Sequence, residues 1–218
     1  MNIIISDELI KLTEAFKITA FECDVEIYEN LELDSFIDSL EHDISKEYDI
    51  SDVIQIPKIL DGRNAYKKYG KDPSRYRLAV ESLFRRLSKG NRLYRINNVV
   101  DTGNVLSLIL QKSTAILDYD KIVGNVQIRL GTSKDEYYGI GRGLLNIDRI
   151  PLYEDNLGPF GSVTSDTERT MISPNTKKIL VFIISFTHQD DLKEDYKIAK
   201  DIFTRYCNAS NFKKHEVS

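Results

Sequence analysis

The feature that most constrains the fold is an uninterrupted apolar segment near the end of the chain, residues 179–186, in which only Ser185 is polar. Isoleucine, valine and phenylalanine dominate the segment, and these residues favour β-strands. It is far too short to cross a bilayer, which takes about 20 apolar residues. A strand that is apolar at every position leaves no face for water, so the segment is predicted to be a central strand buried on both sides.

Other segments show the periodicities of helices and of further strands. Residues 21–27 alternate apolar and acidic side chains, which predicts an antiparallel or edge strand with one face in water. Apolar residues at helical spacing recur in the first half and at the end of the chain. The predicted helices cover residues 33–44, 57–69, 73–89, 97–111 and 190–211, and the other predicted strands cover 115–119, 125–130, 136–140 and 161–172. Residues 213–218 are expected to fray.

The chain of 218 residues fits one domain, residues 1–218, because no linker, repeat or low-complexity stretch divides it. With 41% hydrophobic residues it can bury a substantial core. We expect an α+β fold with mixed or antiparallel sheets packed by helices. Residues 1–59 would form an N-terminal strand and helix part, and residues 190–211 a closing C-terminal helix.

Several functional classes are disfavoured by the sequence. Cys23 and Cys207 lie far apart without a CxxC motif, and the three histidines are scattered, so neither a zinc site nor a disulfide framework is expected. The glycine loop 139–143 leads toward Pro151 rather than into a helix that could hold a pyrophosphate. The N-terminus lacks a basic leader before an apolar stretch. We therefore expect a cytoplasmic protein with no metal and no cofactor.

Charge is divided unevenly along the chain. Residues 1–62 hold 4 basic against 16 acidic residues, a net charge of −12, whereas residues 63–95 hold 11 against 2, a net charge of +9. The basic block could attract a polyanion, or the acidic first third could pack against it and neutralise it. Tyrosines between the basic residues would allow stacking with unpaired bases. The candidate RNA-binding residues are Arg75, Arg77, Arg85, Arg86, Lys89, Arg92 and Arg95.

Two polar groupings could carry chemistry. Asn97, Asp101 and Asn104 share one face of an otherwise apolar predicted helix. Such groups need hydrogen bonds when buried, so they either tie loops together or line a wet pocket, and the pattern alone favours the structural alternative. Residues 164–170 are seven consecutive polar residues, which the pattern alone describes as a solvated hairpin.

The order and spacing of several motifs resemble a known family. The motifs are KDPSRYR at 71–77, ESLFRR at 81–86, RINNVVD at 95–101, LDYDKIVG at 117–124, and the later Gly161, Asp166, Arg169 and PNTK at 174–177. Over about residues 60–188 the chain resembles the B3/4 domain, and it is most similar to free-standing members. In the phenylalanyl-tRNA synthetase beta subunit this module edits mischarged tRNA. The resemblance therefore implies tRNA or aminoacyl-tRNA as partner, and editing hydrolysis in trans as activity.

The resemblance also shows departures from the synthetase module. Gly103 stands where that module has a pocket threonine, Ala115 where it has a pocket histidine, and the acid after its glycine pair falls near Val163. Three side chains of the editing pocket are therefore absent, so the synthetase's discrimination of tyrosine is not carried over to this chain.

Hydrolysis of an aminoacyl ester needs a positioned water, a donor for the developing oxyanion and a pocket for the amino acid. The candidate catalytic carboxylates are Asp101, Asp166 and Glu168, and the candidate pocket residues are Asn97, Gly103, Asn104, Ala115, Gly139, Gly141 and Gly161. Two alternatives stay open: a tRNA-binding module without turnover, and a protein that binds a small molecule resembling an aromatic amino acid in the same pocket.

Overall fold

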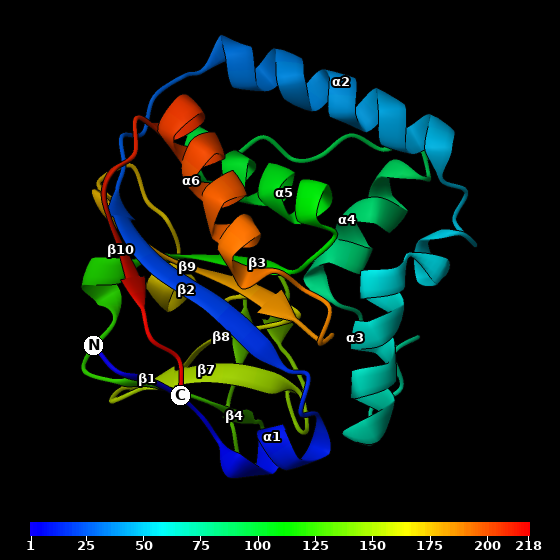
Figure 1. Ribbon diagram of the computed structural model, residues 1–218, viewed down its shortest axis with the longest axis vertical. Helices are drawn as coiled ribbons and strands as arrows, with labels where there is room; N and C mark the ends of the chain where they lie inside the picture. Colours follow the sequence, from blue (N-terminus) through cyan, green and yellow to red (C-terminus); the bar gives the residue numbers. More distant parts are fainter.

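Two four-stranded sheets form the centre of the molecule in the computed structural model, which describes residues 1–218 (Figure 1). The α-helices are α1 (Asp7–Leu12), α2 (Leu31–Glu47), α3 (Pro57–Lys68), α4 (Ala79–Leu87), α5 (Asn98–Leu110) and α6 (Leu192–Cys207). The strands are β1 (Ile3–Ile5), β2 (Lys17–Asp24), β3 (Thr114–Asp118), β4 (Val126–Leu130), β5 (Tyr138–Gly139), β6 (Gly143–Leu144), β7 (Pro151–Asp155), β8 (Gly158–Ser162), β9 (Lys178–Ser185) and β10 (Ser210–His215). Short 3₁₀ helices are η1 (Val53–Gln55), η2 (Tyr119–Lys121) and η3 (Glu168–Thr170). The predicted α+β class is confirmed.

The strand orders explain which segments are buried. One sheet has the order β10-β2-β9-β3 and is antiparallel throughout, and the other has the order β1-β4-β7-β8 with only β1 and β4 parallel. Every residue of β9 after Lys178 is buried. The prediction that the apolar run is a central strand is therefore confirmed, and so is the mixed or antiparallel character of the sheets.

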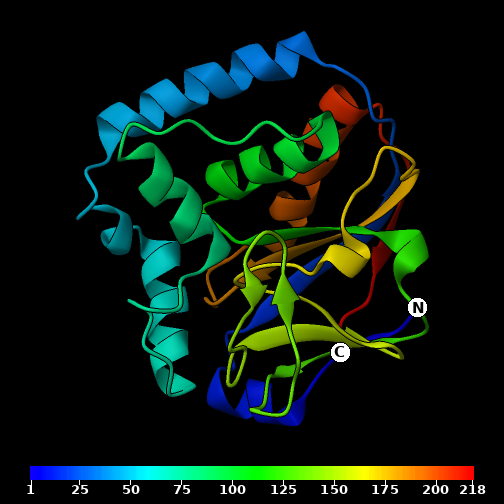
Figure 2. The same cartoon turned by 180° about the vertical axis from the view of Figure 1, so that it is seen from behind.

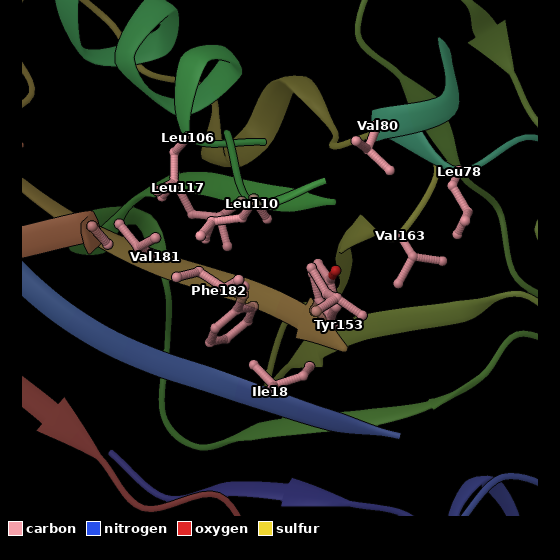
Figure 3. Packing of buried hydrophobic residues seen from close by; sticks show 14 of the residues in the cluster. Ile18, Leu78, Val80, Leu106, Leu110, Leu117, Tyr153, Val163, Val181 and Phe182 are labelled. Carbon is pink, nitrogen blue, oxygen red and sulfur yellow. The ribbon is translucent and has the colours of Figure 1, made fainter. Parts of the chain in front are cut away.

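The sheet that contains β9 is covered on both faces. Helices α5 and α6 pack side by side on one face, and the second sheet packs against the other (Figure 1). Figure 3 shows Phe182 of β9 pointing toward Tyr153 of β7, and their rings meet edge-on with centroids 5.0 Å apart. Helix α2 lies across the ends of α5 and α6, and α3 and α4 flank the sheets. No helix is long and apolar enough to cross a membrane.

The expectation of a strand with a wet face at residues 21–27 is wrong. Strand β2 ends at Asp24, and its six inner residues are buried. Phe21 packs edge-on against Tyr196 of α6, with ring centroids 5.3 Å apart. Glu22, only 7% exposed, hydrogen-bonds His215 of β10 at 2.7 Å. The acidic side chain is therefore covered by a histidine from the far end of the chain rather than by water.

The helix expected from residue 73 starts later. The Asp72 carboxylate accepts the Ser74 N–H at 2.8 Å and closes a turn, and α4 begins only at Ala79. An Asp-Pro pair is typical of turns as well as of helix starts, and here the turn is formed. We call residues 71–77 the basic turn, because it carries Lys71, Arg75 and Arg77.

Two predictions near the C-terminal half also need correction. Strand β8 covers only Gly158–Ser162, and a loop and η3 follow it, so no strand extends over 161–172. The closing helix α6 ends at Cys207, and β10 pairs with β2 instead of fraying. Ser218 is also held, because its carbonyl accepts the Ile5 N–H at 2.7 Å.

The hairpin formed by β5 and β6 stands outside both sheets. Figure 2 shows it in front of the sheets, with its turn directed toward α5. It is fastened to the loop after β8, because Gly139 pairs with Thr167 and the Ile140 N–H donates to the Asp166 carbonyl at 3.0 Å. The hairpin and this loop therefore face the N-terminal half of α5, where the candidate site lies.

Candidate functional site

A mostly apolar cavity of about 220 Å³ lies between α5, β3, the hairpin and the loop after β8. Helix α5 supplies one wall and β3 the floor, and the hairpin and loop close the other side. The lining residues are Ile96, Val100, Gly103, Asn104, Thr114, Ile116, Ile140, Asp166, Met171 and Ile172. Apolar walls with a few polar groups are typical of a small-molecule site.

Asp166 is the only ionisable residue that lines this cavity. Its Oδ1 atom is buried without a hydrogen-bond partner. Burial raises the pKa of the carboxyl from 3.8 to about 7, a backbone hydrogen bond from Ser162 opposes the shift, and no charged side chain contributes. A carboxyl that is about half ionised near neutral pH is suited to accept or donate a proton, and such groups concentrate at functional sites.

Gly161 provides the space that the carboxyl occupies. A Cβ atom at this position would lie 2.7 Å from the Tyr153 ring and 2.8 Å from Asp166 Oδ1, closer than carbon atoms are found to such neighbours. Gly161 therefore contributes to the site from behind Asp166 and does not line the cavity itself. The hydroxyl of Tyr153, the neighbour on the other side, is also buried without a partner.

Asn104 lines the cavity from α5, and its side chain makes no hydrogen bond within the chain, so its amide is free to bind a ligand. One residue earlier, Gly103 allows β3 to approach the helix, since a side chain there would collide with Ile116. The Gly103 carbonyl accepts hydrogen bonds from Ser107 and Thr114, both at 3.0 Å. Gly103 therefore lines the cavity with its backbone, and Ala115, which points away from it, does not line it.

The hairpin wall is held firmly in place. The Tyr137 hydroxyl donates to the Ser165 carbonyl, and Ile140 presents its side chain to the cavity. Gly139 is buried against Leu145 and Ser165, where a side chain would not fit. Gly141, at the tip, is exposed with open space around it. Gly139 and Gly141 were both expected to lie in the pocket. Neither lines the cavity, but both shape the hairpin that forms its wall.

The other polar residues of α5 hold loops together. Asn97 caps the helix by accepting the N–H groups of Val99 and Val100. The Asp101 carboxylate accepts the Ile96 N–H at 3.1 Å, and its pKa is raised by burial while Ile96 and Arg95 act against the rise. Both residues border a separate, more open cavity of about 380 Å³. The expected shared face is therefore divided, with Asn104 on the Asp166 side and Asn97 and Asp101 on the other.

Glu168, Cys23 and Cys207 do not line the cavity. Glu168 is exposed at the start of η3. Cys23 and Cys207 are fully buried, and burial raises the pKa of Cys207 to about 12, which disfavours a reactive thiolate. Nowhere in the chain do three or more His, Cys, Asp or Glu side chains gather as ligands of a metal would.

The basic block is only partly neutralised by the acidic N-terminal third. Arg92 and Arg95 pair with Asp38 of α2 at 2.7 and 2.8 Å. Arg86 lies over the Tyr94 ring, 4.0 Å from its centroid. The remaining candidates make no ion pair, and they are Arg75, Arg77, Arg85 and Lys89. Neutralisation by the acidic N-terminal third therefore applies to Arg92 and Arg95 and does not extend to these four residues.

The basic turn lies beside the segments that border the cavity. The Ala79 N–H, just after the turn, donates to the Val163 carbonyl at 3.0 Å, in the loop that carries Asp166. Lys71 of the turn donates to the Asn146 side chain at 3.4 Å, in the segment that follows the hairpin. These two contacts hold the ends of the basic turn against the loop after β8 and the segment after the hairpin.

Several residues of the site were missed from the sequence. The missed residues are the polar Thr114 and six apolar ones, and they come from four separate segments. The apolar residues are Ile96, Val100, Ile116, Ile140, Met171 and Ile172. In the sequence, the only sign of these residues is that apolar residues flank the polar stretch 164–170 and the glycine loop 139–143. This sign does not reveal which segments meet in the fold.

Comparisons with known proteins place this geometry in a family. A family model of the B3/4 domain matches residues 61–215. The chain is similar in fold to the crystal structure of an N-terminal fragment of the phenylalanyl-tRNA synthetase beta-subunit from Pyrococcus horikoshii, with a TM-score of 0.53 and 10% identity over 100% of this chain. It spans about half of that fragment, 51% of its length. No curated protein matches the chain in sequence. The family match covers most of the residues, and the chain belongs to the B3/4 domain family.

Proposed function

We propose that the chain binds the aminoacyl end of a charged tRNA in the Asp166 cavity and hydrolyses the ester in trans. The observation that carries the proposal is a single carboxyl in a mostly apolar cavity of amino-acid size, with its Oδ1 atom buried without a partner and its pKa raised to about 7. The family membership supports tRNA as the partner, since the structural neighbour is part of an aminoacyl-tRNA synthetase.

The proposed reaction uses Asp166 as general base. An ionised Asp166 takes a proton from a water molecule, and the water oxygen bonds to the ester carbonyl carbon. The Asn104 amide, free of other partners, donates to the oxygen that becomes negative. The bond from the carbonyl carbon to the ribose oxygen then breaks, that oxygen takes the proton from Asp166, and the free amino acid and tRNA leave.

The same cavity suggests which amino acids fit. Its volume of about 220 Å³ is below the range of about 300–1,000 Å³ typical of sites for drug-sized ligands. Aliphatic side chains form most of the lining, and Asp166 carries the only charge. The proposed substrates therefore carry an apolar amino acid of moderate size.

RNA binding would use the basic residues that have no ion-pair partner. Arg75, Arg77, Arg85 and Lys89 have no carboxylate partner that phosphates would have to displace. Contacts of this kind release counterions, so binding weakens steeply as salt rises. Arg92 and Arg95 are occupied by α2 and are left out of the proposed RNA surface.

The test is release of labelled amino acids from a panel of correctly and wrongly charged tRNAs. Wild type should release apolar amino acids with turnover, and Asp166→Asn should be slower by about 100-fold or more. Glu168→Gln is the matched control, because it removes an exposed carboxylate two residues away. Equal rates in wild type and Asp166→Asn would contradict the assignment of the base.

A second candidate function is a tRNA-binding module without turnover. The observation that favours it is that the unpaired basic residues are available whether or not the cavity is reactive. It predicts salt-dependent binding of tRNA together with no release from any member of the panel. If neither binding nor release is seen, but apolar amino acids raise the melting temperature, the cavity serves a small molecule instead.

A further inference from the structure

The size of the cavity leaves most of the proposed substrate outside. An aminoacyl group fits in about 220 Å³, but the terminal nucleoside attached to it does not. If the aminoacyl group enters, the ribose and base must rest on the surface at the mouth. Three lining residues are themselves well exposed at this mouth, with Ile96 at 64%, Ile140 at 39% and Met171 at 41%.

The hairpin continues this exposed apolar surface away from the mouth. Its turn, residues 140–142, begins with the cavity residue Ile140. Tyr138 and Leu144 are direct cross-strand neighbours and are 57% and 66% exposed. Side chains opposite each other on paired strands lie close together, so the two form one open platform. Nothing in the chain covers it.

The Tyr138 ring is free to stack. Tyr94, the other strongly exposed tyrosine, already has Arg86 on its ring, 4.0 Å from the centroid, and Tyr76 has Lys71 at 4.2 Å. Tyr138 is absent from the aromatic pairs and from the cation–π contacts of the chain. A flat aromatic ring with open faces is what an unpaired base stacks on, whatever its sequence.

The turn of the hairpin carries a positive charge, which the phosphate of a bound nucleotide would need. Arg142 is exposed and makes no ion pair or side-chain hydrogen bond. It stands between Gly141 and Gly143, whose φ angles are +64° and +68° and which have no neighbouring atoms where side chains would be. The guanidinium is therefore unpaired within the chain, and its planar fork matches two phosphate oxygens.

We propose that the hairpin 138–144 is the binding site of the 3′-terminal nucleotide of the bound RNA. The base would stack on Tyr138 and Leu144, and the phosphate would bind Arg142. This inference rests on the proposed function for the choice of RNA as occupant. The hairpin is suited to the task because its base is fixed by the Tyr137 hydroxyl on Ser165 and by the Ile140 N–H on the Asp166 carbonyl. Those contacts hold the platform at a constant position relative to the carboxyl that would act on the ester.

The test separates nucleotide binding from hydrolysis. Binding of the RNA trinucleotide CCA to the full chain is measured by fluorescence anisotropy at low salt. Wild type should bind it, and Tyr138→Ala and Arg142→Ala should each weaken binding by about tenfold. Tyr138→Phe, which keeps the ring, should bind like wild type. Lys134→Ala, which removes an exposed lysine from the turn between β4 and the hairpin, is the control for charge.

The same variants are then assayed on esters. On charged tRNA they should raise KM by about tenfold with little change in kcat, whereas hydrolysis of amino-acid methyl esters, which lack a nucleoside, should be unchanged. No binding of the trinucleotide, or equal binding by all variants, would overturn the hairpin proposal even if tRNA is deacylated. A change in oligomeric state in Tyr138→Ala would overturn it too, because the platform would then be a contact between copies. Trinucleotide binding without any ester hydrolysis would retain the hairpin and refute only the hydrolase.

Discussion

Replacing Asp166 by Asn should make the protein more stable, and increasingly so as pH rises. The folded carboxyl has a pKa of about 7 against 3.8 as its ordinary value, a difference of about three pH units. Each unit corresponds to 1.36 kcal/mol, so burial of the ionised form is unfavourable by about 4 kcal/mol above pH 7. Asn has nearly the same shape, and Oδ1 has no hydrogen bond to lose.

The sign of the pH dependence follows from the raised pKa. Below about pH 4 the carboxyl is neutral in both the folded and the unfolded chain, so it imposes no penalty. Between pH 4 and pH 7 the unfolded chain ionises first, and the wild type loses stability as pH rises. Tyr137 and Tyr153, the titratable neighbours of Asp166, have pKa values raised by burial, so they stay neutral throughout this window.

Urea unfolding of wild type and Asp166→Asn at pH 5 and pH 8 measures the effect. The variant's advantage in unfolding free energy should grow by about 2.5 kcal/mol between the two pH values, because two of the three units lie in that interval. Titration of all other groups cancels in the comparison of the two proteins. An advantage that is the same at both pH values would refute a buried carboxyl with a raised pKa.

Two further substitutions test the surface and the packing behind the site. Arg75→Glu with Arg77→Glu should weaken tRNA binding and flatten its salt dependence in filter binding, with unfolding by urea unchanged. Arg92→Glu with Arg95→Glu should do the reverse, lowering the unfolding free energy by about 1 kcal/mol or more because the ion pairs with α2 become repulsive, while affinity for tRNA changes little. Gly161→Ala should lower the unfolding free energy by about 1–3 kcal/mol, since its Cβ would press on Tyr153 and Asp166, and a melting temperature equal to wild type would show that the space is not needed.

The elements that were predicted correctly are those whose signal is local. The apolar run of β9 and the amphipathic spacing of α2 and α6 need no knowledge of the rest of the chain. The basic turn was mistaken for the start of a helix because Asp72-Pro73 is compatible with both structures. The choice between them depends on contacts of the following residues, such as the Ala79 N–H on Val163, which lies far away in sequence.

The C-terminal strand β10 also depends on contacts that the local sequence does not reveal. Residues 210–215 are mostly polar and charged, so the pattern predicts a frayed end. They form β10 because Glu22 of β2 offers a partner to His215 at 2.7 Å and to Lys213 at 3.9 Å. Burial alone would raise the pKa of Glu22, but these two partners and Lys178 hold it below its ordinary value.

The candidate site was predicted in part. The sequence placed Asp166, Gly103, Asn104 and Gly161 among the site residues, and all four lie at or directly behind the cavity. It could not separate Asp166 from Asp101, because each is an acid within a polar grouping. What separates them is a tertiary contact, since Asp101 is held by the Ile96 N–H whereas Asp166 Oδ1 has no partner. Such a difference exists only once four segments of the chain have come together.

The most direct measurement is the pH dependence of single-turnover release of an apolar amino acid from its tRNA. With Asp166 as general base, the rate should rise with pH and level off with an inflection near pH 7, matching the pKa of the buried carboxyl. The inflection should vanish in Asp166→Asn and persist in Glu168→Gln. A flat profile, or an unchanged profile in Asp166→Asn, would contradict the proposal that this cavity hydrolyses the ester.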